Sequence, residues 1–233
     1  STTQIKALTT DQVKSLTTLQ IGNLSTDQLK ALTTDQLVKL TTDEVAAIKT
    51  SQLGGLTTDQ VKALTTDQVS AIETSDLSAL TTAAIRGLST DGIQALTTEQ
   101  VGVLTSAQVA ALTTAQVAAI ETDDIEAFGT NQIKALTSAQ VAALTTDQVA
   151  AIETGDITAL TTAAIQGLTT AGIQAAIIGL ISSALLSSLS MTALLLAKST
   201  VAVVTAGWAS RAFCRLAAQP PQDMPETVSS MVI

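Results

Sequence analysis

The stretch Leu64-Thr65-Thr66-Asp67-Gln68-Val69-Ser70-Ala71 contains the unit from which most of this chain is built. Twenty-one consecutive octads of this kind run from Leu8 to Ala175 without an insertion or a deletion. Position 1 is always Leu, Ile or Phe, position 6 is always Val, Ile or Leu, and position 3 is always Thr or Ser. Position 8 is mostly Ala or Gly. An uninterrupted internal repeat predicts a repeat architecture for residues 1–175.

The period of the repeat restricts the local structure of each octad. In a strand, positions 1 and 6 would point to opposite faces, because side chains alternate. In one continuous helix, an octad advances by about 800°, so the apolar stripe would drift by about 80° in every octad. We therefore expect one short helix in each octad, with a change of direction between helices.

Each octad also carries the residues that begin a helix. Thr65 is placed to act as N-cap, and Gln68 three positions later completes a capping box. Leu64 and Val69 have the spacing of a hydrophobic staple around that cap. In five octads position 2 is neither Thr nor Ser, and there we expect the cap to move to position 3; these residues are Lys49, Glu73, Glu121, Gly129 and Glu153.

A single octad cannot fold alone, which predicts an all-α solenoid. Burying one Leu and one Val does not offset the entropy of ordering a whole octad, so neighbouring octads must stack. Near-copies of sequence recur along the chain: residues 152–175 nearly repeat residues 72–95, and residues 104–127 resemble both residues 56–79 and residues 136–159. Each of these offsets is a whole number of octad pairs, so we expect two helices per coil.

Composition excludes several classes of function. The chain contains no His and no Tyr, and its single cysteine, Cys214, excludes an internal disulfide and a cysteine-based zinc site. Without the commonest general base and a companion nucleophile, we expect no enzymatic activity. The net charge is −9, and residues 65–175 carry twelve acids against Arg86 and Lys134. Such a surface repels phosphate backbones, so we expect no nucleic-acid partner.

The Leu-Thr-Thr-Asp-Gln-Val-x-Ala octads resemble the repeats of very large secreted or surface-exposed bacterial proteins. The resemblance covers residues 1–175 and implies an extracellular or cell-surface, adhesin-like protein, with no catalytic residues carried over. Residues 144–152 also resemble the opening of a TAL-effector repeat. The long repeat and basic stripe of that family are missing here, so this second resemblance does not imply DNA binding.

Three octads share the pattern Ile-Glu-Thr-x-Asp and offer paired carboxylates. The pairs are separated by whole numbers of octad pairs, which places them on one edge of a two-helix coil. Oxygen-rich clusters suit Ca²⁺, although acids at helix N-termini are also stabilised by the helix dipole. Calcium is the one cofactor that the sequence suggests, and its candidate ligands are Glu73, Asp76, Glu121, Asp124, Glu153 and Asp156.

Two polar features of the octad have alternative interpretations. The Gln at position 5 recurs in thirteen octads, and we favour a capping role over a buried amide ladder along the solenoid. The Thr-Thr pairs form a regular hydroxyl array like that of ice-binding solenoids. If the hydroxyls are engaged in N-cap hydrogen bonds, no such array is free to bind ice.

The repeat ends after Ala175, and an apolar segment follows. Residues 175–197 are long enough to span a bilayer as one helix, with Lys198, Arg211 and Arg215 as a cytoplasmic anchor. Five serines dilute the hydrophobicity of this segment: Ser182, Ser183, Ser187, Ser188 and Ser190.

We favour the alternative in which residues 176–218 form a helical hairpin that caps the open end of the solenoid. A coding artefact such as a frame change would also explain the abrupt shift in residue usage. Residues 219–233 contain three prolines and are predicted to be a disordered tail. Since the chain begins with Ser1 rather than Met, we expect a fragment or a processed product.

The sequence therefore predicts a non-enzymatic, extended structural or adhesive repeat module of a secreted or surface protein. Its expected partner is an unidentified protein or surface, and end-to-end self-association is open to it. Two alternatives are a membrane-anchored repeat protein that uses residues 175–197 as its anchor, and a rod that binds Ca²⁺ or ice.

Overall fold

The computed structural model describes residues 1–186 of the chain. Every regular element among the described residues is an α-helix. Residues Ser1–Ala176 form one compact unit, and a second unit begins at Ile177. The second half of the predicted hairpin, the predicted disordered tail and the end of the proposed membrane segment lie outside the described residues.

One short helix forms in each octad before the last, which confirms the central prediction. The first twenty-one helices have four to six residues each. Their bounds are α1 Thr2–Lys6, α2 Thr10–Lys14, α3 Thr18–Gly22, α4 Thr26–Lys30, α5 Thr34–Leu37, α6 Thr42–Ala46, α7 Thr50–Leu53, α8 Thr58–Ala63, α9 Thr66–Ser70, α10 Thr74–Leu77, α11 Thr82–Ile85, α12 Thr90–Gln94, α13 Thr98–Gly102, α14 Ser106–Ala111, α15 Thr114–Ala119, α16 Thr122–Glu126, α17 Thr130–Ala135, α18 Ser138–Ala143, α19 Thr146–Ala151, α20 Thr154–Ile157 and α21 Thr162–Ile165. A longer helix, α22, spans Thr170–Leu186 and ends the octad pattern.

The helix start is the one that the octad encodes. In α9, the N-cap Thr65 has an extended backbone and its hydroxyl accepts from the backbone N–H of Gln68. The side-chain oxygen of Gln68 accepts in return from the backbone N–H of Thr65, at 3.1 Å. These two bonds satisfy donors that the first turn of a helix leaves free, so a helix of one or two turns can form.

The cap remains at position 2 in every octad, which corrects the expected shift to position 3. Where position 2 is Lys49, Glu73, Glu121, Gly129 or Glu153, that residue is still the N-cap but forms no side-chain cap bond. At Lys49 and Gly129 the glutamine three positions later still accepts from the backbone N–H of the N-cap. Position 3 is the first helical residue throughout, so its Thr or Ser needs a different explanation.

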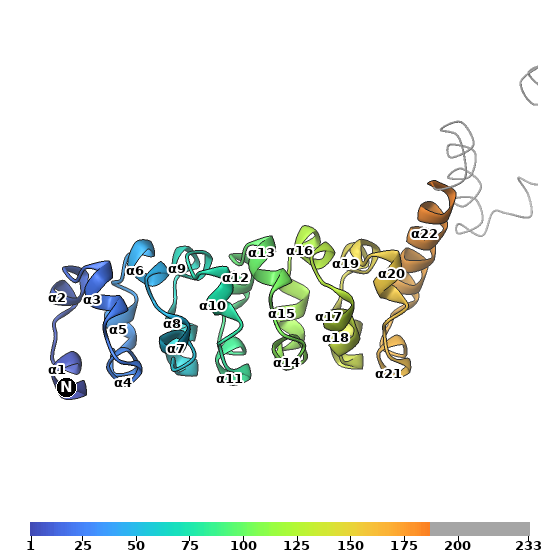
Figure 1. Cartoon of the computed structure of the whole chain (residues 1–233). Helices are drawn as coiled ribbons and strands as arrows, with labels where there is room; N and C mark the ends of the chain where they lie inside the picture. Colours follow the sequence, from blue (N-terminus) through green and yellow to red (C-terminus); the bar gives the residue numbers. More distant parts are fainter. Residues whose placement is uncertain (187–233) are drawn as a thin grey trace, which may run out of the picture. The chain divides into compact units, whose positions relative to one another are not determined.

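Three helices, rather than two, make up one coil. Each helix packs on the helix three places later in the chain, as α11 does on α14 and α14 does on α17. The predicted count of two is therefore wrong, and a coil contains three octads. The helices stack in three rows, which we call the α1, α2 and α3 rows after their first members. Figure 1 shows consecutive members α13, α16 and α19 of the α1 row following one another along the solenoid.

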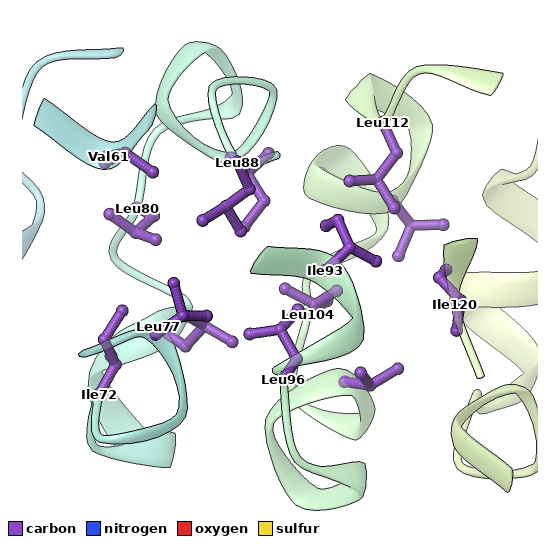
Figure 2. Close-up of a cluster of buried hydrophobic side chains, with 14 of the residues drawn as sticks. Val61, Ile72, Leu77, Leu80, Leu88, Ile93, Leu96, Leu104, Leu112 and Ile120 are labelled. Atoms are coloured by element: carbon purple, nitrogen blue, oxygen red, sulfur yellow. The ribbon is translucent and has the colours of Figure 1, made fainter. Parts of the chain in front are cut away.

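Positions 1 and 6 form one aliphatic core that runs along the solenoid. Leu77 at position 6 is fully buried, and Leu80 and Leu104 at position 1 are nearly so. Figure 2 shows these three side chains within one cluster of buried hydrophobic residues, in which Leu104 lies near Ile93 and Leu96. Aromatic bulk is almost absent, and Phe128 is the one aromatic residue in this core. Among the described residues, no helix is long and apolar enough to cross a membrane.

Replacing Leu104 by Ala tests the register of this core. Leu104 is 4% exposed, so Leu104→Ala leaves a cavity and should lower the free energy of unfolding by about 2–5 kcal/mol. Leu19 lies at position 4 and is 74% exposed, so the same substitution there should change it by less than about 0.5 kcal/mol. Urea unfolding followed by circular dichroism measures both variants, and equal losses would contradict the assigned register.

Candidate functional site

The most distinctive polar feature of the chain is a glutamine side chain that bonds in two directions. In Gln108, the side-chain oxygen accepts from the backbone N–H of Thr105 at 2.8 Å, which completes the capping box of its own helix. The side-chain nitrogen donates to the carbonyl oxygens of Leu77 at 3.0 Å and Leu80 at 2.7 Å. These two carbonyls lie at the corner between octads of the previous coil. One amide therefore starts its own helix and fastens it to the coil before it.

Ten glutamines at position 5 repeat this bonding along the solenoid. Each donates to the carbonyl of a position 1 residue in the previous coil. Each also donates to the position 6 carbonyl that precedes that residue at the same corner. The ten are Gln36, Gln52, Gln60, Gln68, Gln100, Gln108, Gln116, Gln132, Gln140 and Gln148. The predicted capping role is confirmed, and the amide ladder that was its alternative forms as well.

The first three glutamines at position 5 show the capping role by itself. Gln12 and Gln20 are exposed and Gln28 is half-buried, and the carbonyls that a ladder amide contacts, 28 and 31 residues earlier, would fall before Ser1 for all three. Each accepts from its N-cap backbone N–H, at 2.9, 2.8 and 2.8 Å respectively. These three glutamines therefore cap a helix without fastening it to another coil.

Hydroxyls at position 3 form a second set of links between coils. The hydroxyls of Thr26, Thr58 and Ser106 donate to position 4 carbonyls of the following coil, at 3.3, 3.2 and 3.1 Å. Together with Thr50, Thr98 and Thr130, which donate to Asp side chains, six position 3 hydroxyls link coils in this way. Position 2 hydroxyls are used as caps, so both hydroxyls are engaged in four octads, those that contain Thr26, Thr58, Thr98 and Ser106. Ice binding by the hydroxyl array stays a prediction.

The three Asp residues predicted as calcium ligands occupy the place of the ladder glutamine. Asp76, Asp124 and Asp156 lie at position 5, and each accepts from the hydroxyl of a position 3 threonine in the previous coil. The distances are 2.5 Å from Thr50 to Asp76 and 2.8 Å from Thr98 to Asp124. Thr130 donates to Asp156 in the same way. A carboxylate cannot donate as the amide does, so the polarity of the link is reversed.

The paired Glu residues point elsewhere, and the three pairs do not share an edge. Glu73, Glu121 and Glu153 are exposed N-caps without a side-chain cap bond. Because a coil holds three octads, α10 and α16 belong to the α1 row, whereas α20 belongs to the α2 row. The expected single edge is therefore wrong. Among residues 1–186, no group of three or more His, Cys, Asp or Glu side chains is placed to hold a metal ion.

The surroundings of Asp124 raise the pKa of its carboxyl above the ordinary value. Burial raises the pKa of Asp124, and the nearby charges of Glu121 and Asp123 raise it further. The hydrogen bond from Thr98 acts in the opposite direction and lowers the pKa. Since the effect of burial on the pKa exceeds that of the hydrogen bond, folding destabilises the ionised form of Asp124 relative to the protonated form.

A shallow groove crosses the surface near this carboxyl. It has a volume of about 330 Å³, and its lining residues are Gln94, Ala118, Ala119, Ile120, Glu121, Thr122, Thr145 and Gln148. The lining contains one ionisable group, Glu121, so it offers no pair of groups for acid–base catalysis.

The fold and its links place the chain in the class of α-solenoid repeat proteins. The ALTTAQ repeat family model matches residues 13–42, 39–71, 69–106, 117–151 and 149–175. The chain therefore belongs to the ALTTAQ repeat family. No curated protein and no solved structure matches it.

Replacing Gln108 by Glu separates the two bonds of the ladder amide. The carboxylate can still accept from the Thr105 N–H, but it cannot donate to Leu77 and Leu80. We expect Gln108→Glu to lower the free energy of unfolding by about 1–3 kcal/mol, because buried carbonyls lose their donor. Gln12→Glu, which removes no link between coils, should change it by less than about 0.5 kcal/mol. Similar losses in urea unfolding would refute the ladder.

Replacing Asp124 by Asn tests the cost of the buried carboxylate. The pKa of Asp124 is higher in the folded chain than in the unfolded chain, so the folded state binds the proton more tightly. The free energy of unfolding therefore falls as the pH rises from the pKa of the unfolded chain through the pKa of the folded chain. At pH 7 Asp124→Asn should therefore melt at a higher temperature than the parent chain, and below about pH 4 the advantage should vanish. Asp147→Asn, at an exposed site, is the control. A pH-independent difference between Asp124→Asn and the parent would contradict the assignment.

Proposed function

We propose that this chain is a non-enzymatic structural module that sets a distance and presents a repeated contact surface. The observation that carries the proposal is the recurrent use of the polar groups along the solenoid. Position 2 hydroxyls start helices in most octads, and ten position 5 amides both start a helix and fasten it to the previous coil. What varies between octads is mainly positions 4 and 7, which are largely exposed and carry residues as different as Asp, Glu, Lys, Arg, Gln, Ala, Ser and Gly.

The outward positions also support a role in contact with another surface. From α10 to α19, the α1 row exposes several acids: Glu73, Glu99, Glu121, Asp123, Glu126 and Asp147. Exposed Ala residues occupy the corresponding positions of α14, α15 and α18. The module therefore presents rows of different chemistry on a common core. The resemblance of its octads to secreted bacterial repeats favours an extracellular or cell-surface setting and an adhesive role.

Deleting one complete coil tests the spacer role. Removal of residues 96–119 takes out three octads and returns every following helix to its own row. The chain should stay helical, and its maximum dimension in small-angle X-ray scattering should shorten by about 9 Å, the spacing of packed helices. Removal of residues 113–116 deletes half an octad with its cap and should lower the melting temperature strongly. Failure of the coil deletion to fold, or an unchanged dimension, would overturn the proposal.

A further inference from the structure

Residues 72–95 make one of two complete coils that lack the amide ladder, and residues 152–175 make the other. At residues 72–95, the three position 5 residues are Asp76, Ala84 and Gly92, none of which carries an amide. Three consecutive octads make one full coil, so the whole junction between this coil and the previous one is affected. We call it the amide-free junction. The next coil, residues 96–119, is fastened to its predecessor by three glutamines.

The three rows differ in what remains at the amide-free junction. In the α1 row, the Thr50 hydroxyl donates to Asp76 at 2.5 Å. In the α2 row, the Thr58 hydroxyl donates to the carbonyl of Ala83 at 3.2 Å. In the α3 row, no side-chain hydrogen bond joins α9 to α12 within the part of the chain that the structure describes. Two rows are thus held by one hydroxyl each, and the third by apolar packing alone.

A side chain at position 92 would meet a close contact with the helix cap, which would have to shift by a few tenths of an ångström. A Cβ atom built there would lie 3.3 Å from the Ser89 hydroxyl oxygen and 3.5 Å from the nearest atom of Leu88. Ser25 and Gln28 combine the same cap and glutamine in α4. A glutamine at position 92 would have the carbonyls of Val61 and Leu64 in the two places that the ladder carbonyls occupy elsewhere. Because α4 holds a serine cap together with a position 5 glutamine, this close contact does not bar a glutamine from position 92, and the junction lacks the amide because of its residues.

We propose that the amide-free junction is a built-in opening point, at which the α3-row edge separates while the α1 and α2 rows act as a hinge. The stability of a solenoid is approximately a sum of repeat terms and nearest-neighbour interface terms, so an interface with few bonds opens before the neighbouring ones. The same replacements, Asp156, Ala164 and Gly172, recur at residues 152–175. Such a module extends or bends at fixed places under load, while the coils between them stay intact.

Hydrogen exchange of the full chain, measured by mass spectrometry, tests the proposal. Amides of residues 61–71 should exchange about tenfold faster than those of residues 101–117. This factor is what the missing amide of the α3 row would contribute if its net effect on opening equals that of about one hydrogen bond. Gly92→Gln should slow the exchange of residues 61–71 by about tenfold, because it adds the missing donor. Gly92→Ala stiffens the helix equally without the amide and should slow it by less than about threefold.

Three outcomes would overturn the proposal. Equal exchange at residues 61–71 and 101–117 in the parent chain would show that the junction does not open preferentially, and this readout needs no variant. Equal slowing by Gly92→Gln and Gly92→Ala would show that the amide is not the cause. Ala84→Gln offers the same restoration in the α2 row, and no slowing by any Gln variant that keeps its helical circular dichroism would also refute the mechanism.

Discussion

The carboxamide of the position 5 glutamine is the group on which the architecture depends. A buried polar side chain is costly unless each of its atoms finds a partner. In Gln108 the oxygen takes the N–H that begins its own helix, while the nitrogen takes carbonyls that end a helix of the previous coil. Within the described residues, no buried side-chain nitrogen or oxygen lacks a partner. The solenoid can therefore bury an amide in about half of its octads and gain both a helix start and a fixed stacking distance.

The local structure was predictable because its determinants lie within one octad. Leu64, Thr65, Gln68 and Val69 specify a capped helix and its buried face without reference to any other part of the chain. The number of helices per coil was not predictable in this way. Positions 1 and 6 are buried whether a coil holds two or three helices, so the pattern does not distinguish the two. The offsets between near-copies of sequence record duplication of octads, and two of the three offsets are not whole numbers of coils.

In the candidate site, too, the features determined within one octad were predictable and those determined by the stacking of coils were not. The sequence suggested capping or a ladder for the glutamines as alternatives, because it cannot show that one amide reaches two coils. It also paired Glu121 with Asp124 as calcium ligands by their spacing. In the fold, Asp124 takes the inward glutamine position and bonds to Thr98, whereas Glu121 faces outward at the N-cap. The recurring hydroxyl at position 3 was a further signal of contact between coils, and the six hydroxyls that form such links could be identified only once the stacking was known.

The mismatch between a unit of one octad and a coil of three has a consequence for how such proteins diversify. Gain or loss of a single octad keeps every helix and the core intact, yet it moves all later octads into the neighbouring row. Residues 72–95 and 152–175 already show this effect, since nearly identical segments occupy rotated positions. Slippage in a repetitive gene can therefore reshuffle which side chains lie next to one another on the outside. Surface variety becomes accessible through changes of copy number, without point mutations and without a folding penalty.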